Sequence, residues 1–248
     1  MTDYFETHGE MAENLTDDTK IAGRYGIQNV AERRILSDVS RKLQIEATDR
    51  CLDVGCGPGN ITIPLSFVTA EVVAVDHPAV VTRLEKRAPE RNEITTIGGD
   101  FLERSFEREF DSILIYSVLQ ELESRSQVFE FVEKARKLLA PGGRMLIGDL
   151  PNTDRKSRFL DAEFGQRFSE EWDKVMADSG ESLDQFDGVE GTTFDDDVLL
   201  SLLEATRKED CNSFLRSQPS DLPFGHTRED IVVERYPPAD TEFDITPS

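Results

Sequence analysis

The chain has 248 residues, of which 50 are acidic and 28 are basic, so its formal net charge is −22 at neutral pH. This charge disfavours binding to a phosphate backbone, and we expect no nucleic acid partner. The length suits one domain built around one substantial core. We see no run of roughly 20 apolar residues that could span a membrane, and the first ten residues do not resemble a secretion signal, so we expect a cytoplasmic protein.

The basic residues are mainly arginine, with 20 Arg against 8 Lys. High acid content with little lysine resembles proteins of halophiles, whose molar cytosolic salt screens self-repulsion over about 3 Å. An ordinary acidic protein from low salt is the alternative. The cysteines (Cys51, Cys56 and Cys211) are odd in number and widely spaced. We therefore expect neither a disulfide framework nor a metal site.

Short β-branched runs alternate with longer amphipathic stretches between residues 49 and 150, which indicates a parallel sheet with crossover helices. The predicted strands are residues 51–54, 71–76, 94–97, 110–117 and 144–149, the last of them launched by a Pro-Gly-Gly turn at 141–143. A capping box at Ser124 and Gln127 predicts a helix before the fifth strand. Each strand ends in polar or glycine residues, where a site could form.

The alternation of β-branched runs and amphipathic stretches ends after residue 150. Residues 151–194 are polar and weakly periodic, which predicts an insertion outside the sheet. Regular structure returns with a predicted helix over 195–207. Two further strand candidates, 212–216 and 230–236, are separated by a Pro-rich loop, which favours an antiparallel hairpin at one sheet edge. We expect the tail from residue 237 to be disordered.

Glycines occupy alternate positions directly after the first predicted strand, in the run Asp53-Val54-Gly55-Cys56-Gly57-Pro58-Gly59. Such glycines let the backbone bend tightly and approach a ligand closely. The spacing differs from the G-x-G-x-x-G of dinucleotide-binding proteins. The run resembles the first motif of the class I S-adenosylmethionine-dependent methyltransferases, Asp-x-Gly-x-Gly-x-Gly, which holds the methionine part of the cofactor.

This resemblance implies S-adenosyl-L-methionine as the cofactor and a Rossmann-like α/β fold. The expected sheet has seven strands, mostly parallel with an antiparallel C-terminal hairpin strand, and helices on both faces. Asp76, at the end of the second strand, would accept both ribose hydroxyls, and its charge would repel the 2′-phosphate of NADP. His77 would contact adenine or solvent. At the end of the third strand, Asp100 would receive the adenine amino group and Phe101 would wall the base.

Residues 116–122 resemble the family's segment that lines the cofactor and faces the substrate, which makes Ser117 a cofactor contact and Gln120 a positioning candidate. Each acid also has a structural alternative, because Asp53, Asp76 and Asp100 could simply cap turns or helices. Phe101 could likewise be a core residue.

The resemblance divides the chain into a helical lid (1–48), a cofactor-binding core (49–150), a substrate-side insertion (151–194), a last helix and hairpin (195–236) and a tail (237–248). Tyr25, in the lid, could reach the cofactor carboxylate or only pack the lid. Trp172 is expected to anchor the insertion, with sugar stacking as the alternative.

The acceptor is predicted from the stretch Asp-Leu-Pro-Asn (149–152) and the cations Arg155 and Arg158 that follow it. This stretch resembles methyltransferases of surface-polysaccharide assembly, and with the composition it resembles haloarchaeal enzymes that methylate a hexuronic acid in the N-glycan of the surface-layer glycoprotein. The two arginines could clamp an acidic sugar, or form salt bridges at the surface. A small molecule or glycan is the expected acceptor, and no catalytic base is identified. A nicotinamide-dependent oxidoreductase and a non-catalytic binding module remain as alternatives.

Overall fold

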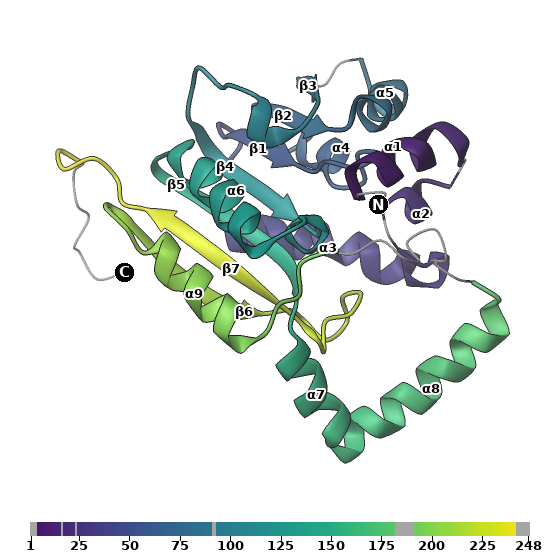
Figure 1. Ribbon diagram of the computed structural model, residues 1–248. Coiled ribbons are helices and arrows are strands. Elements are labelled where there is room, and N and C mark those ends of the chain that lie inside the picture. The colour runs from purple at the N-terminus through teal and green to yellow at the C-terminus, as the bar shows by residue number, and fades with distance from the viewer. Residues whose placement is uncertain (1–3, 16, 23, 91–92, 182–190, 242–248) are drawn as a thin grey trace.

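The computed structural model describes residues 4–15, 17–22, 24–90, 93–181 and 191–241, and it is built around one seven-stranded sheet (Figure 1). The strand order is β3-β2-β1-β4-β5-β7-β6. The strands are β1 (Arg50–Val54), β2 (Glu71–Asp76), β3 (Ile94–Gly98), β4 (Phe110–Tyr116), β5 (Leu139–Pro151), β6 (Cys211–Ser217) and β7 (Arg228–Arg235). The first five strands are parallel, and β7 pairs antiparallel with both β5 and β6. The predicted fold, including its C-terminal hairpin, is confirmed.

Helices cover both faces of the sheet. Beside the longer helices there are three short 3-10 segments, η1 (Gly26–Gln28), η2 (Phe101–Glu103) and η3 (Leu119–Glu121). The α-helices are α1 (Tyr4–Asn14), α2 (Asp18–Ile21), α3 (Asn29–Leu43), α4 (Thr62–Leu65), α5 (Pro78–Arg87), α6 (Arg125–Lys137), α7 (Thr153–Asp161), α8 (Glu163–Ser179) and α9 (Asp196–Thr206).

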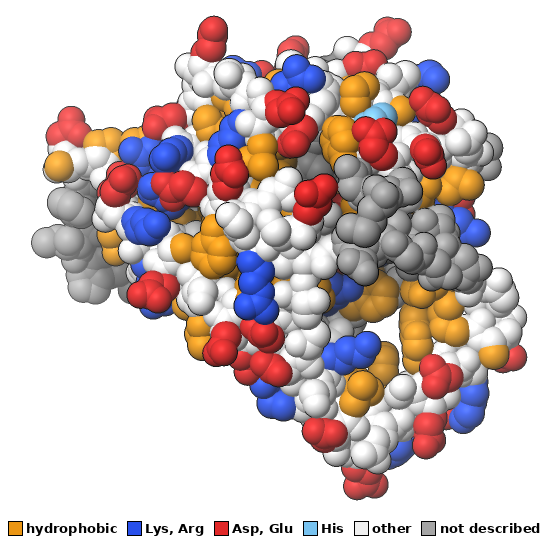
Figure 2. Space-filling view, in the orientation of Figure 1, with side chains coloured by type: hydrophobic (Ala, Val, Ile, Leu, Met, Phe, Trp, Pro, Cys, Tyr) orange, Lys and Arg blue, Asp and Glu red, His pale blue; other side chains and the backbone are white. Residues whose placement is uncertain are grey.

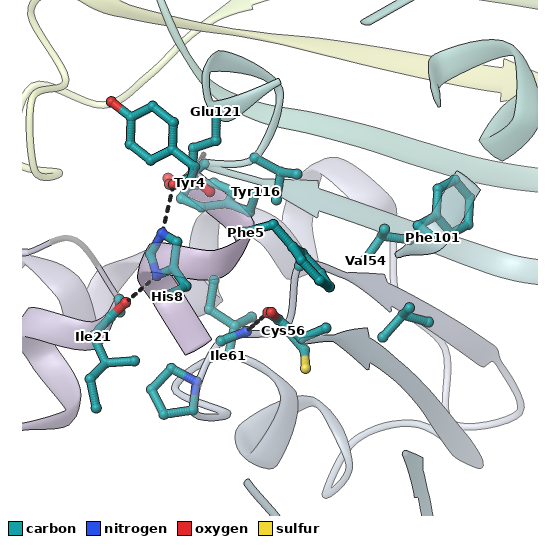
Figure 3. A pocket seen from close by; sticks show the side chains of 18 of the residues that line it. Tyr4, Phe5, His8, Ile21, Val54, Cys56, Ile61, Phe101, Tyr116 and Glu121 are labelled. Carbon is teal, nitrogen blue, oxygen red and sulfur yellow. Dashed lines mark hydrogen bonds and ion pairs between the residues drawn. The ribbon is translucent and has the colours of Figure 1, made fainter. Parts of the chain in front are cut away.

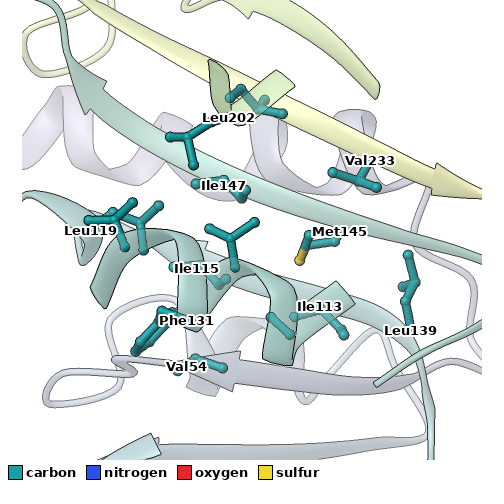
Figure 4. Close-up of a cluster of buried hydrophobic side chains, with 14 of the residues drawn as sticks. Val54, Ile113, Ile115, Leu119, Phe131, Leu139, Met145, Ile147, Leu202 and Val233 are labelled. Atoms are coloured by element: carbon teal, nitrogen blue, oxygen red, sulfur yellow. The ribbon is translucent and has the colours of Figure 1, made fainter. Parts of the chain in front are cut away.

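Alternation along the strands separates the two halves of the core, because successive side chains of a strand point to opposite faces. Ile113 and Ile115 of β4 face α6 and α9, together with Met145 and Ile147 of β5 (Figure 4). On the opposite face, Leu114 packs with residues of α3 and α4. All of these strand residues are fully buried. The central strands therefore have no solvent-facing side, and their carboxyl ends are left as the place for a site.

Two details differ from the sequence predictions. β5 begins at Leu139, five residues earlier than predicted, because the Pro-Gly-Gly turn is accommodated inside the strand as a register shift opposite Phe110 and Ser112. Ser124 caps α6 as expected, but the Gln127 side chain accepts from the backbone N–H of Glu123 and not from that of Ser124. Part of the predicted tail, 242–248, lies outside the described residues.

The predicted insertion is mostly helical. Asn152 caps α7 by accepting from the backbone N–H groups of Asp154 and Arg155, each at 3.0 Å. At the corner between α7 and α8, a Cβ on Gly165 would lie 1.8 Å from the carbonyl oxygen of Phe159, so only glycine lets the two helices meet this closely. Among the described residues, no helix combines the length and apolar character needed to cross a membrane.

Acidic side chains lie over many different elements on the face shown in Figure 2, with basic ones between them. At a net charge of −22 this surface repels itself, and salt screens that repulsion. We therefore expect the melting temperature of the protein to rise when KCl is increased from about 0.1 M to about 2 M. A thermal scan monitored by circular dichroism measures this, with an uncharged solute at equal osmolality as control. A melting temperature that stays level or falls would contradict the expectation.

Candidate functional site

The chain makes a tight bend directly after β1. Gly55, Gly57 and Gly59 have φ angles of 74°, 55° and 93°, a region that other residues rarely occupy. A Cβ on Gly55 would also lie 2.2 Å from Cγ2 of Val118, and one on Gly59 would lie 2.9 Å from Cδ1 of Leu84. The backbone N–H of Gly55 donates to the carbonyl oxygen of Val75 at 2.8 Å. The bend is therefore built from bare backbone and fixed to the end of β2.

Asp76, the last residue of β2, lies against this bend. Its Oδ2 accepts from the backbone N–H of Gly57 at 2.8 Å, and its Oδ1 accepts from that of His77 at 2.6 Å. Burial raises the pKa of Asp76, while the positive charge of His8 and these two N–H donors act in the opposite direction. The glycine bend and the carboxylate that the sequence singled out thus meet at adjacent strand ends.

Asp53 supports the same bend from inside the protein. It is 2% exposed, and its Oδ2 accepts from the hydroxyl of Thr62 at 2.7 Å. Burial raises the pKa of Asp53 to about 7. The carboxyl does not line the pocket described next, so in this structure it joins β1 to α4.

A pocket of about 290 Å³ lies between the bend, the ends of β2, β3 and β4, and α1 (Figure 3). This is near the lower end of the range for small-molecule sites. Of the residues predicted to bind the cofactor, the pocket is lined by Gly55, Cys56, Gly57, Asp76, Asp100, Phe101 and Ser117. Gly59 instead packs into the core, against Leu84 and Ile63.

Asp100 and Phe101 meet the pocket where β3 ends. Asp100 caps η2 by accepting from the backbone N–H of Leu102 at 2.8 Å. Phe101 is 3% exposed, and its ring centroid lies 4.7 Å from that of Phe131. The structural alternatives are therefore correct for both residues, and both residues also border the pocket. Their contact with the adenine stays a prediction.

The lid brings a buried cation to the pocket. Arg24 is 7% exposed and lines the pocket. Its Nη2 donates to Oδ2 of Asp149 at 2.8 Å and also to the hydroxyl of Ser117, which itself donates to Asp149 at 2.6 Å. Ser117 and Asp149 both have a φ of 63°, an unusual value for residues other than glycine. The sequence analysis had considered its neighbour Tyr25 for this side of the site and not Arg24.

His8 fastens α1 to the opposite side of the pocket. Its Nδ1 lies 3.0 Å from the carbonyl oxygen of Ile21, and its Nε2 lies 3.2 Å from Oε1 of Glu121. Both partners are acceptors, so the ring satisfies both when each nitrogen carries a proton. Burial would lower the pKa of His8, but the Glu121 carboxylate and Asp76 raise it to about 9. His8 is therefore a cation at neutral pH.

Three other predicted residues lie outside the pocket lining. His77 caps α5 by accepting from the backbone N–H of Ala79, and its ring packs 4.8 Å from that of Phe5. Tyr25 packs edge-on against Trp172, with ring centroids 6.0 Å apart, which agrees with lid packing and with the anchoring role of Trp172. Gln120 lies in η3, and its side-chain oxygen is buried with no hydrogen-bond partner in the described part of the chain.

Arg155 and Arg158 do not reach the pocket lining either. Arg155 donates to the carbonyl oxygen of His226 at 2.9 Å and to Oε1 of Glu229 at 3.3 Å. Arg158 pairs with Asp196 at 2.6 Å and 3.1 Å. The salt-bridge alternative thus describes their present contacts, with Glu229 and Asp196 as the partners.

Helix α1 supplies three pocket residues that the sequence analysis missed. Tyr4, Phe5 and His8 all line the pocket, and Figure 3 shows the Phe5 ring extending from α1 toward its centre. The signal that could have found them is their spacing, because positions three and four apart lie on one face of a helix.

Comparison with known proteins matches residues 52–147 to a family described as a methyltransferase domain. This part of the chain, less than half of its length, is therefore similar to a methyltransferase domain. A malonyl-[acyl-carrier protein] O-methyltransferase of Priestia megaterium is 31% identical over 103 residues. That alignment covers 41% of this chain and 36% of the relative, so it spans only about a third of the curated relative's length.

Two solved structures show how far this methyltransferase fold extends. The N-methyltransferase NodS of Bradyrhizobium japonicum, in complex with S-adenosyl-L-homocysteine, has a TM-score of 0.60 at 19% identity and covers 94% of this chain and 99% of its own. The mitomycin 7-O-methyltransferase MmcR also has a TM-score of 0.60, at 16% identity, and covers 92% of this chain and 60% of its own. The fold is therefore shared over nearly the whole chain.

Replacing Asp53 by Asn tests the support beneath the glycine bend. The folded-state pKa of about 7 lies above the ordinary 3.8, so ionised Asp53 is disfavoured in the fold. Its contribution to stability is present below pH 3.8 and lost as the pH rises through about 7. Asn cannot ionise and can still accept from Thr62. From pH 4 to pH 8, the free energy of unfolding of Asp53→Asn should therefore gain up to about 4 kcal/mol over the parent.

Urea denaturation of the ligand-free proteins at several pH values measures this difference. The control is Asp111→Asn, which removes a half-exposed carboxylate whose pKa is lowered by Arg50. The pKa of Asp111 lies below 3.8 in the fold, so this residue is ionised in the folded and the unfolded chain from about pH 5 upward. That variant should therefore differ from the parent by a nearly constant amount from pH 5 to pH 8. If the free energies of unfolding of the parent and of Asp53→Asn change in parallel with pH, burial does not raise the pKa of Asp53 and the prediction is wrong.

Proposed function

We propose that this chain transfers the methyl group of S-adenosylmethionine to a small-molecule acceptor. The observation that carries the proposal is the contact of the Asp76 carboxylate with the Gly57 N–H at the edge of the pocket. A carboxylate beside a bare-backbone bend offers two acceptor oxygens for a ribose diol and a close approach for the rest of an adenosyl ligand.

The residues present fit such a ligand. Asp76 would accept the ribose hydroxyls, and Asp100 would accept the adenine amino group beside the Phe101 ring. The bend at Gly55 and Gly57 would face the methionine part. Arg24 lines the same pocket. We therefore assign the contact to the methionine carboxylate, which the sequence had suggested for Tyr25, to the guanidinium of Arg24. Ser117 would position Arg24 through its hydroxyl.

The charges of the pocket also favour a sulfonium ligand over a dinucleotide. Carboxylates of Glu32, Asp76, Asp100, Glu121 and Glu123 line it, against the cations of Arg24 and His8. The surplus of negative charge attracts a sulfonium cation and repels a pyrophosphate. The nicotinamide alternative therefore lacks both the glycine spacing and the charge that it needs.

Bound S-adenosylmethionine supplies an electrophilic methyl group on a positively charged sulfur. The chain's task is to hold the acceptor in line with the methyl–sulfur bond and to keep water away. The acceptor atom would form the new bond to the methyl carbon as the methyl–sulfur bond breaks with its electron pair left on sulfur, and the proton of an O–H or N–H acceptor would be released to the bulk solvent outside the site. No residue of the pocket needs to form a covalent bond.

A hexuronic acid of a surface glycan stays a prediction as the acceptor. Arg155 and Arg158 would have to exchange their present partners, Glu229 and Asp196, for the carboxylate of the sugar. The present structure favours an acceptor that needs no cation, and both classes belong in one assay.

Calorimetric titration with S-adenosylmethionine, S-adenosylhomocysteine and NAD tests the cofactor. We expect the first two ligands to bind and NAD not to bind. Asp76→Ala should weaken S-adenosylhomocysteine binding at least about tenfold, because hydrogen bonds to a charged group are lost. The control, Asp111→Ala, removes a carboxylate at the opposite end of the sheet and should bind like the parent. Preference for NAD, or an Asp76→Ala variant with unchanged affinity, would refute the proposal.

Transfer of a labelled methyl group separates an enzyme from a binding module. The panel contains a neutral phenol, an aromatic amine, glucuronic acid and a neutral sugar. Labelled product from any of them supports methyl transfer. A protein that binds the cofactor and labels none of the panel would favour the module.

A further inference from the structure

Helices α7 and α8 form an arm that leaves the sheet after β5 and returns toward the N-terminal helices (Figure 1). At the far end of the arm, the side chain of Glu181 accepts from the backbone N–H of Ile27 at 3.4 Å. Figure 2 shows an opening between this arm and the rest of the molecule, bordered largely by hydrophobic side chains. The arm is thus attached at both ends and spans a gap.

The apolar face of α8 is turned toward that gap. Phe164, Phe168 and Trp172 follow one another at intervals of four residues, and Val175 comes three residues later, which places them on one side of the helix. Phe168 lies 4.9 Å from the ring of His226, and Trp172 contacts Tyr25, so this side faces the body. Even so, Phe164 is 62% exposed and Phe168 is 41% exposed. Large apolar side chains exposed in one group mark a binding surface.

The same face continues to the wall of the cofactor pocket. The Tyr25 ring lies 6.4 Å from that of Phe224, which belongs to the loop between β6 and β7. The guanidinium of Arg24 lies 5.9 Å from the centre of the Phe224 ring. Arg24 lines the pocket, so contacts between aromatic rings lead from α8 to the place where a methyl group would be presented.

Two cations at the base of the arm already have acidic partners. Arg155 and Arg158 are paired with Glu229 and Asp196. His226 stacks flat on Phe159, with ring centroids 4.8 Å apart and an interplanar angle of 7°. Burial, helped by Arg155, lowers the pKa of His226, so the ring is neutral at pH 7 and forms part of the apolar lining.

We infer that the gap between the arm and the β6–β7 loop binds the methyl acceptor, and that it selects a neutral molecule with an aromatic or otherwise apolar ring. Phe168, Trp172 and Phe224 contact the ring system, and an O–H or N–H group on its edge points toward Arg24 and the pocket. The inference rests on the proposed function and adds the class of the acceptor. A second copy of the chain is the competing occupant, because an exposed helix face can also pair with itself.

Trp172 is the only tryptophan in the sequence, so its fluorescence reports directly on this gap. The probe is the flavone apigenin, a neutral ring system that absorbs tryptophan emission, added to the full chain saturated with S-adenosylhomocysteine. We expect saturable quenching. Phe168→Ser should raise the apparent dissociation constant at least about fivefold, because an apolar contact is lost. The matched control is Leu200→Ser, at a 55% exposed apolar residue of α9, and it should behave like the parent.

Two further measurements distinguish the possible failures. S-adenosylhomocysteine should bind Phe168→Ser as tightly as it binds the parent, and in the labelling panel the neutral phenol should be methylated faster than glucuronic acid. If the parent and Phe168→Ser bind apigenin equally, or if glucuronic acid is the better acceptor, the inference is wrong while the cofactor site stands. If sedimentation shows a dimer and Phe168→Ser converts it to monomers, a second copy of the chain occupies the gap and the inference is overturned. Failure of the parent to bind S-adenosylhomocysteine would instead remove the proposed function.

Discussion

The site depends on one hydrogen bond, from the backbone N–H of Gly57 to the carboxylate of Asp76. It joins the bend after β1 to the end of β2, the two places where the chain gives a ligand a close backbone and a charged acceptor. Further hydrogen bonds fix the bend on one side of this contact and β2 on the other. Asp53 binds Thr62 beneath the bend, and the carbonyl of Val75 receives the N–H of Gly55. All three glycines have positive φ angles, and a side chain at Gly55 or Gly59 would in addition collide with its neighbours.

The lid reaches the site through buried charges. Arg24 and Asp149 form an ion pair in which the two side chains are 8% and 1% exposed, and His8 pairs with Glu121 on the other side of the pocket. Removing a single partner of such a pair leaves an uncompensated charge and costs far more than breaking a surface pair. These contacts lie away from solvent and are screened by salt less than the exposed pairs are.

The strands of the core could be predicted because their signal is local. β-branched runs ended by Gly, Asp or Ser gave β2 with its exact residues, and β1, β3 and β4 to within one residue at each end. The acids Asp76 and Asp100 followed from their place at strand ends. The start of β5 was missed because a Pro-Gly-Gly sequence normally ends a strand, and here the pairing with β4 carries the strand through it.

The rest of the site could not be read from the sequence because it depends on contacts between distant segments. Arg24 and Tyr25 are neighbours, and the choice between them is made by Asp149, more than a hundred residues later. Arg155 and Arg158 look unpaired in the sequence, which suggested an anion clamp. Their partners, Glu229 and Asp196, lie far along the chain and could not be identified from it. The arm was predicted only as a polar insertion. Its apolar stripe at Phe164, Phe168 and Trp172 is clear once α8 is known to be a helix.

A crystal structure of the chain with S-adenosylhomocysteine tests the central claim most directly. It should show both ribose hydroxyls within hydrogen-bonding distance of the Asp76 carboxylate, and the homocysteine part against the backbone of Gly55 and Gly57. A ligand bound elsewhere, or an Asp76 side chain turned away from the ribose, would contradict the account.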